Sequence, residues 1–271
     1  MRGCLAAFAA ALLAAAPAIA GSLTLDGDFA EGGLVRAVAA PGTRVTLDGQ
    51  AVPVAPDGRF LLGFGRDAPA TAELVLLLSD GTREERRLAV AQRSYAVQRI
   101  DGLPRDTVTP DPATLERIKR EAAEVRAARA EPSEEGGFEE RLVWPVRGPL
   151  SGLYGSQRIL DGEPHAPHLG VDIAAPAGTP VVAAASGIVR LAAPLFLTGN
   201  TVIIDHGGGL TTTYAHLSRM DVAVGRRVKQ GEEIGAVGAT GRATGPNLHW
   251  GVEWLGTRLD PQLAAGPMKP E

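Results

Sequence analysis

Turn-forming dipeptides divide the first third of the chain into short β-favouring runs. Asp48-Gly49, Asp57-Gly58 and Asp80-Gly81 are each flanked by such runs. Asp-Gly is a strong hairpin signal because both turn positions adopt positive φ at low cost. Turns at this spacing predict a small antiparallel β-sandwich over residues 21–104. This range contains no histidine, and we find no catalytic cluster in it.

Glycine and proline continue this punctuation to the end of the chain, at 34 and 20 of its 271 positions. Short β-favouring runs at 181–183, 201–204 and 234–237 lie between them. We therefore expect a mainly β protein. Its composition, 45% hydrophobic and 21% charged, is typical of a globular chain. The net charge of -4 argues against a nucleic-acid-binding protein, which would need a strongly basic surface.

One helix is expected between the two β-rich regions. Asp111 is a good N-cap, Pro112 suits the first helical position, and Pro132 ends the helix. We expect an ion pair between Glu116 and Arg120. The apolar positions fall at helical spacing: Leu115, Ile118, Ala122 and Val125. Residues 105–136 are thus predicted to be a helix and linker.

The first twenty residues have the pattern of an export signal. A positive start precedes an apolar run over residues 5–16, and residues 18–20 supply a small-x-small cleavage pattern. The run is too short to span a bilayer. We expect residues 1–20 to be removed, leaving a periplasmic or extracellular protein without a membrane span. The single cysteine, Cys4, lies in this segment, so any metal must be held by histidine and carboxylate ligands.

All five histidines lie in the second half of the chain, where the chemistry is therefore expected. A hydrolytic zinc site needs three protein ligands and a position left open for water. His168, Asp172 and His249 could provide that set. The H-x-x-x-D pattern is weak when taken alone, because a surface histidine beside a turn-capping aspartate would look the same.

The segments around these residues resemble those of a known family. The matching stretches are 167–173, 175–181, 204–207, 214–217, 224–235 and 241–249. In their order and spacing they resemble the lysostaphin-like, or LytM-type, zinc metallopeptidases of bacterial cell walls. The resemblance covers about residues 144–261. It implies a compact antiparallel β domain of the duplicated-hybrid-motif type over residues 137–271, with the site in a groove.

The resemblance also assigns roles to single residues. His168, Asp172 and His249 match the family's zinc ligands, which implies one Zn²⁺ per chain. His216 matches a histidine that stands beside the metal and assists the hydrolytic water or stabilises the oxyanion. Asn247 departs from the pattern, because the family usually has a second catalytic histidine there. An asparagine amide can donate a hydrogen bond to an oxyanion, but it cannot act as an acid or base.

The function implied is a zinc metalloendopeptidase that hydrolyses the peptide cross-links of peptidoglycan. Its partners would be the stem peptides of the wall and other cell-wall proteins. Because of Asn247, the alternative is a weak or inactive protein that binds peptidoglycan or regulates other wall hydrolases. A lipoyl-type carrier over residues 224–235 lacks the expected Asp-Lys display.

Two further histidines and the domain boundary complete the expectations. His165 is interpreted as a residue on the rim of the site, and His206 as part of the turn before Gly207. Since every candidate site residue follows the linker, we expect a fragment starting near Gly137 to fold and bind zinc alone.

Overall fold

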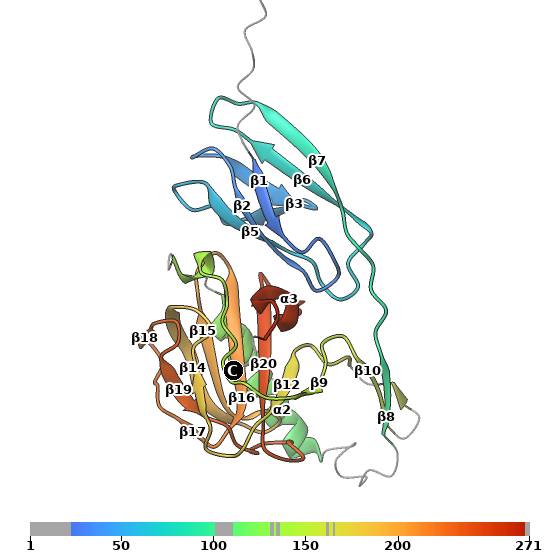
Figure 1. The fold of residues 1–271 in the computed structure, drawn as a ribbon, viewed down its shortest axis with the longest axis vertical. Coiled ribbons are helices and arrows are strands. Elements are labelled where there is room, and N and C mark those ends of the chain that lie inside the picture. The colour runs from blue at the N-terminus through green and yellow to red at the C-terminus, as the bar shows by residue number, and fades with distance from the viewer. Residues whose placement is uncertain are drawn as a thin grey trace, which may run out of the picture.

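The computed structural model describes residues 23–100, 111–130, 133, 136–160, 163–164 and 166–268. The expected export signal and His165 lie outside these residues. Two β-rich domains follow one another along the long axis of the molecule, and helix α2 (Pro112–Ala130) lies beside the second (Figure 1). Within the described residues, no helix is both long and apolar enough to cross a bilayer.

The first domain is a sandwich of two antiparallel sheets, as the turn pattern predicted. One sheet has the order β1-β2-β5 and the other β4-β3-β6-β7. Large apolar side chains such as Phe60, Leu62 and Leu74 are buried in its core. The strands are β1 (Thr24–Gly27), β2 (Leu34–Val38), β3 (Arg44–Leu47), β4 (Gln50–Val52), β5 (Arg59–Gly63), β6 (Thr71–Leu77) and β7 (Arg83–Ala89).

The Asp-Gly dipeptides lie where the hairpins turn. Asp48 and Gly49 have φ values of 48° and 79°, and they join β3 to β4. Gly58 and Gly81 also have positive φ, at 91° and 87°, and Gly81 lies between β6 and β7. A left-handed backbone explains why glycine stands at these positions.

Helix α2 begins as predicted, but its side chains pair differently. The Asp111 carboxylate accepts hydrogen bonds from the backbone N–H groups of Ala113 and Thr114, at 2.9 and 3.0 Å. Glu116 pairs with Lys119 at 2.7 Å, so the expected pair with Arg120 is wrong. Leu115 is 41% exposed. The predicted apolar stripe is therefore only partly buried.

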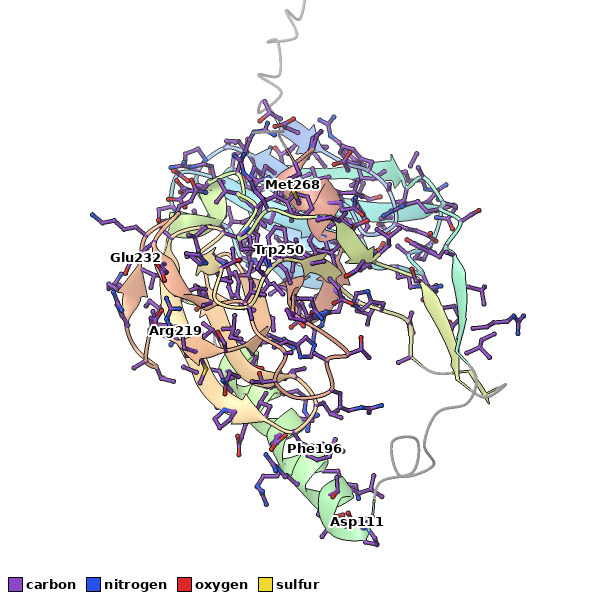
Figure 2. All side chains as sticks on the ribbon, turned by 60° about the horizontal axis from the view of Figure 1, so that its bottom comes forward. Asp111, Phe196, Arg219, Glu232, Trp250 and Met268 are labelled. Carbon is purple, nitrogen blue, oxygen red and sulfur yellow. The ribbon has the colours of Figure 1, made fainter. Side chains whose placement is uncertain are left out.

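The end of α2 packs on the large sheet of the second domain. Val125 and Ala128 contact a small apolar cluster formed by Leu191, Leu195 and Ile203. Nearer the start of the helix, the Glu121 carboxylate accepts a hydrogen bond of 2.7 Å from the backbone N–H of Phe196. Figure 2 shows Phe196 beside the helix and Asp111 at the N-terminal end of the helix.

The second domain consists of two sheets packed around a core. The large sheet has the order β18-β14-β15-β16-β20-β12-β9, with β21 on β20, and the small sheet has the order β13-β19-β17. Large-sheet strands are β9 (Leu150–Gly152), β12 (Val171–Ala174), β14 (Gly187–Leu195), β15 (Gly199–Asp205), β16 (Leu210–Leu217), β18 (Arg227–Val228), β20 (Asn247–Trp254) and β21 (Thr257–Leu259). Small-sheet strands are β13 (Pro180–Val182), β17 (Arg219–Met220) and β19 (Glu233–Ala236). Two short helices flank the sheets, η1 (Gly136–Glu139) and α3 (Pro261–Ala265).

Strand β20 separates the core from the face that carries the candidate site. Leu248, Trp250 and Val252 are fully buried in the core. Because side chains alternate along a strand, His249 and Glu253 belong to the opposite face. Helix α2 lies on that opposite face, where Arg129 pairs with Glu253 at 3.1 Å.

The two domains share a sheet and an ion pair. Strand β8 (Val97–Ile100) pairs in parallel with β10 (Gln157–Leu160), which also pairs with β11 (Glu163–Pro164). Arg93 of the first domain pairs with the buried carboxylate of Asp260 at 2.8 Å. The first domain is thus joined to the second at specific positions.

Candidate metal centre

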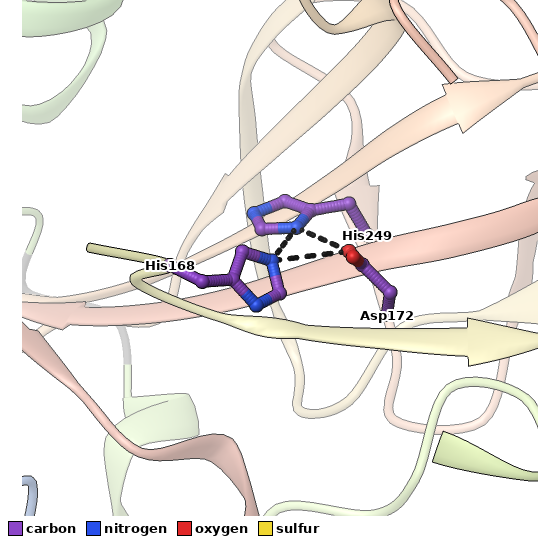
Figure 3. Close-up of side chains that lie close together, drawn as sticks. All are labelled: His168, Asp172 and His249. Carbon is purple, nitrogen blue, oxygen red and sulfur yellow. Dashed lines mark hydrogen bonds and ion pairs between the residues drawn. The ribbon is translucent and has the colours of Figure 1, made fainter. Parts of the chain in front are cut away.

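Three side chains from the second domain converge on one point (Figure 3). His249 Nδ1 lies 2.8 Å from Asp172 Oδ1, and His168 Nε2 lies 3.0 Å from His249 Nδ1. The distance from His168 Nε2 to Asp172 Oδ1 is 3.2 Å. These are the three residues that the sequence singled out as a candidate ligand set.

The sheet register places two members of this cluster. Asp172 on β12 and His249 on β20 are direct partners in an antiparallel pair, so their side chains lie next to each other. His168 precedes β12, and its Nδ1 lies 3.2 Å from the carbonyl oxygen of Leu153. Because a carbonyl can only accept, Nδ1 donates to it, and Nε2 is the ring nitrogen that faces the cluster.

Two glycines leave room for the cluster. A Cβ atom on Gly152 would lie 2.4 Å from Asp172 Oδ2, and one on Gly170 would lie 2.7 Å from His249 Cε1. Neither was identified as a site residue from the sequence. For Gly170 the signal was present, because it stands inside the His-Leu-Gly-Val-Asp segment; for Gly152, nothing local marks the approach of Asp172.

The surroundings keep the cluster ready to bind a cation. Burial alone would raise the pKa of Asp172, but hydrogen bonds from His168 and His249 outweigh it and hold that pKa well below its usual range. Burial lowers the pKa of His249, although the hydrogen bond to Asp172 opposes this shift. Asp172 is therefore charged and His249 neutral at pH 7, which are the forms that coordinate a metal.

The donor set fits zinc. Bonds of about 2.0–2.1 Å in tetrahedral geometry would separate neighbouring ligand atoms by about 3.3 Å. The distances above are close to that value, and the three donor atoms could hold a metal ion together. Two neutral imidazoles and one carboxylate would leave a zinc ion with net positive charge and a coordination position for water.

His216 lies beside the cluster on β16. Its ring centroid is 6.2 Å from that of His249. His216 Nδ1 lies 2.8 Å from the carbonyl oxygen of Thr240, so Nδ1 donates and Nε2 keeps its lone pair. The residue has a φ of 64°, in the left-handed region that residues other than glycine adopt infrequently.

Asn247 occupies the same face of β20 as His249, two residues earlier in the strand. Its Nδ2 donates a hydrogen bond of 3.0 Å to the carbonyl oxygen of Gly245. Its Oδ1 is buried and has no hydrogen-bond partner among the described residues. One amide hydrogen is therefore held in the preceding turn, and the second is the hydrogen that could serve a substrate.

His206 belongs to the core and not to the cluster. It is fully buried, with Nδ1 at 2.8 Å from the carbonyl oxygen of Ser186 and Nε2 at 2.7 Å from the Thr212 hydroxyl. Its backbone N–H donates to Leu210 across the glycine turn, as its position in the sequence suggested. Both ring nitrogens are used, so its role is structural.

Comparison with known proteins agrees with this geometry. The model of peptidase family M23 matches residues 166–261. A solved structure described as a candidate peptidase M23 from Pseudomonas aeruginosa is 33% identical and has a TM-score of 0.67, with 88% of this chain and 95% of that chain covered.

Curated relatives match part of this chain. Cell division protein DipM from Caulobacter vibrioides is 36% identical over 166 residues, which is 59% of this chain and 25% of DipM. Peptidoglycan DD-endopeptidase ShyA from Vibrio cholerae is 42% identical over 103 residues, which is 38% of this chain and 24% of ShyA. The match thus spans about a quarter of each of these relatives. Near-complete coverage of the Pseudomonas structure shows that this chain belongs to peptidase family M23.

Proposed function

We propose that this protein is a zinc-dependent endopeptidase that is exported and hydrolyses the peptide cross-links of peptidoglycan. The observation that carries the proposal is the convergence of His168, Asp172 and His249 within 3.2 Å of one another. The substrate class is taken from relatives such as ShyA, whose name describes a peptidoglycan DD-endopeptidase.

The residues of this chain would divide the work as follows. His168, Asp172 and His249 would hold the zinc ion, which would supply an activated water and polarise the scissile carbonyl. His216 Nε2 is the free ring nitrogen beside the cluster, and it takes the proton of the attacking water and returns it to the leaving amine. The second amide hydrogen of Asn247 donates to the carbonyl oxygen as negative charge develops there.

Incubation of the purified chain, lacking residues 1–20, with cross-linked muropeptides tests this activity. We expect cleavage that yields uncross-linked products by mass spectrometry, that stops on chelation and that returns with zinc. His249→Ala, which removes a ligand, should be inactive and should not retain zinc. A zinc-loaded chain that cuts none of the cross-linked muropeptides would contradict the proposal.

That negative result would favour a second function without catalysis. The presence of Asn247 is the observation in favour of it. An asparagine cannot act as the acid or base that the family usually has there. A chain that holds zinc but does not turn over would be a peptidoglycan-binding protein or a regulator of other wall hydrolases. Sedimentation with purified peptidoglycan sacculi distinguishes these outcomes, because a binder pellets with the wall without releasing fragments.

A further inference from the structure

The loop over residues 153–156 holds His168 at three atoms. Leu153 accepts from the His168 ring at 3.2 Å. The backbone N–H of Gly155 donates to the His168 carbonyl at 2.7 Å, and the His168 N–H donates to Ser156 at 2.9 Å. Both the main chain and the ring of this ligand therefore depend on the position of one loop.

The same loop is held from its other side by the first domain. Arg66 Nε donates a hydrogen bond of 2.7 Å to the Gly155 carbonyl. Immediately beyond the loop, the Gln157 N–H donates to the Ala96 carbonyl at 2.9 Å, and the parallel pairing of β8 with β10 follows. Gly155 thus contacts the first domain through its carbonyl and His168 through its N–H.

The Tyr95 ring packs directly on Gly155. A Cβ atom on Gly155 would lie 2.0 Å from Tyr95 Cδ1, so only glycine admits the ring at this distance. The Arg66 guanidinium lies over the same ring, 4.5 Å from its centroid, and Tyr154 meets it edge-on at 6.2 Å. Tyr95 and Arg66 form one unit, since a cation over an aromatic face stabilises both groups.

This segment of the first domain is itself anchored. The Arg93 backbone N–H donates to the Glu31 carboxylate at 2.8 Å, and its side chain donates to the Glu31 carbonyl at 2.9 Å. The same guanidinium pairs with Asp260 at 2.8 Å. These contacts of Arg93 fix the backbone two residues before Tyr95, and so they fix the position of the Tyr95 ring against the loop.

We infer that Arg66 and Tyr95 are positioning residues for the metal ligand His168, so that the first domain supports the zinc site without touching it. The inference rests on the zinc site proposed above. The contacts run from Arg66 and Tyr95 to Gly155, and from the loop to the backbone and ring of His168. Residues that orient a ligand in this way tune metal affinity, and their loss usually weakens binding by about 10–100-fold.

The test measures the zinc dissociation constant of full-length variants by competition with a chelator. We expect Tyr95→Ala and Arg66→Ala to weaken zinc binding by about 10-fold, the lower end of the range for outer residues. Tyr95→Phe keeps the ring and should bind zinc like the wild type. Arg59→Ala is the matched control. Arg59 of the first domain also reaches the second, where it donates to Glu139 of η1, but it does not contact the loop.

Amide hydrogen exchange supplies a second readout on the metal-free chain. In Tyr95→Ala and in Arg66→Lys, which keeps the charge but lacks Nε, the amides of Gly155 and His168 should exchange faster. Amides in the core of the sheet, such as that of Trp250, should not change. If Tyr95→Ala fails to fold, Arg66→Lys still decides the question.

The outcomes separate this inference from the proposed function. Zinc affinity and loop exchange that match those of Arg59→Ala would overturn the role of Arg66 and Tyr95 while leaving the zinc site intact. A wild-type chain that binds zinc no better than His249→Ala would refute the zinc site itself, and this inference with it.

Discussion

At the scale of single residues, Asn247 offers the sharpest test of the proposed catalysis. Asn247→Ala should lower kcat without loss of zinc, by up to about 10²–10³-fold if the free amide hydrogen is well aligned with the oxyanion. His216→Ala should be more severe, because it removes the free Nε2 that accepts a proton. Steady-state kinetics on a defined cross-linked peptide, at matched zinc content, provide the measurement.

The reverse substitution is equally informative. Asn247→His restores the residue usual in the family and should give equal or higher activity if the ring fits opposite Ala174, its partner on β12. Wild-type activity that is indifferent to His216→Ala would contradict the assigned roles. Activity that arises only in Asn247→His would show that a single substitution has removed turnover from this chain.

At the scale of elements, α2 is fastened to the sheet by a buried cluster of charges. Arg129 and Glu253 are 10% and 9% exposed, and Arg258 pairs with the same carboxylate at 2.7 Å. Burial and the neighbouring Arg258 charge lower the pKa of Arg129 to about 10. The single carboxylate therefore compensates two guanidinium groups.

We expect Glu253→Gln to lower the free energy of unfolding by about 3–5 kcal/mol, because it leaves a buried arginine without its counter-charge. Glu116→Gln is the control on the helix itself, where an exposed pair with Lys119 is worth less than about 1 kcal/mol. Urea denaturation followed by circular dichroism compares the two. Equal stabilities would show that the cluster does not fasten the helix.

Local signals explain which elements could be predicted from the sequence. The turn at Asp48-Gly49 and the cap at Asp111 depend on residues within a few positions, so their chemistry is visible in the sequence. The candidate ligand set for the metal was also visible, but mainly because its residues match those of a known family. Spacing alone left His168 and Asp172 ambiguous.

Contacts between distant residues were not predictable in this way. Arg129 donates to Thr213, 84 residues away, and nothing in the helical pattern marks that partner. The apolar stripe predicted both Leu115 and Val125 as packing residues. Val125 does pack on the sheet, but Leu115 is exposed, and Ala128, which the stripe did not include, packs beside Val125. Arg66 and Tyr95 lie in a domain without histidine, so no sequence pattern linked them to the metal site.

At the scale of the whole molecule, the second domain should fold by itself but bind zinc less well than the intact chain. A fragment starting at Gly137 keeps its own core, whereas it lacks Arg66 and Tyr95 and exposes the side of Trp254 that approaches Gly63. We expect a lower Tm and a zinc affinity reduced by about 10-fold. Calorimetry and chelator competition provide the measurements; values equal to those of the full chain would support complete independence.

The parallel pairing of β8 with β10 bears on how such chains can be recombined. A chimera that replaces the whole first domain by another would be cut near residue 104, where that domain was predicted to end. The register of β8 runs from Val97 opposite Gln157 to Ile100 opposite Leu160, so that cut would leave β10 with a foreign neighbour. A graft that keeps residues 93–100 with the recipient peptidase domain would preserve β8 and its pairing with β10. The useful crossover point for protein engineering therefore lies inside the first domain, before Arg93, and not at its end.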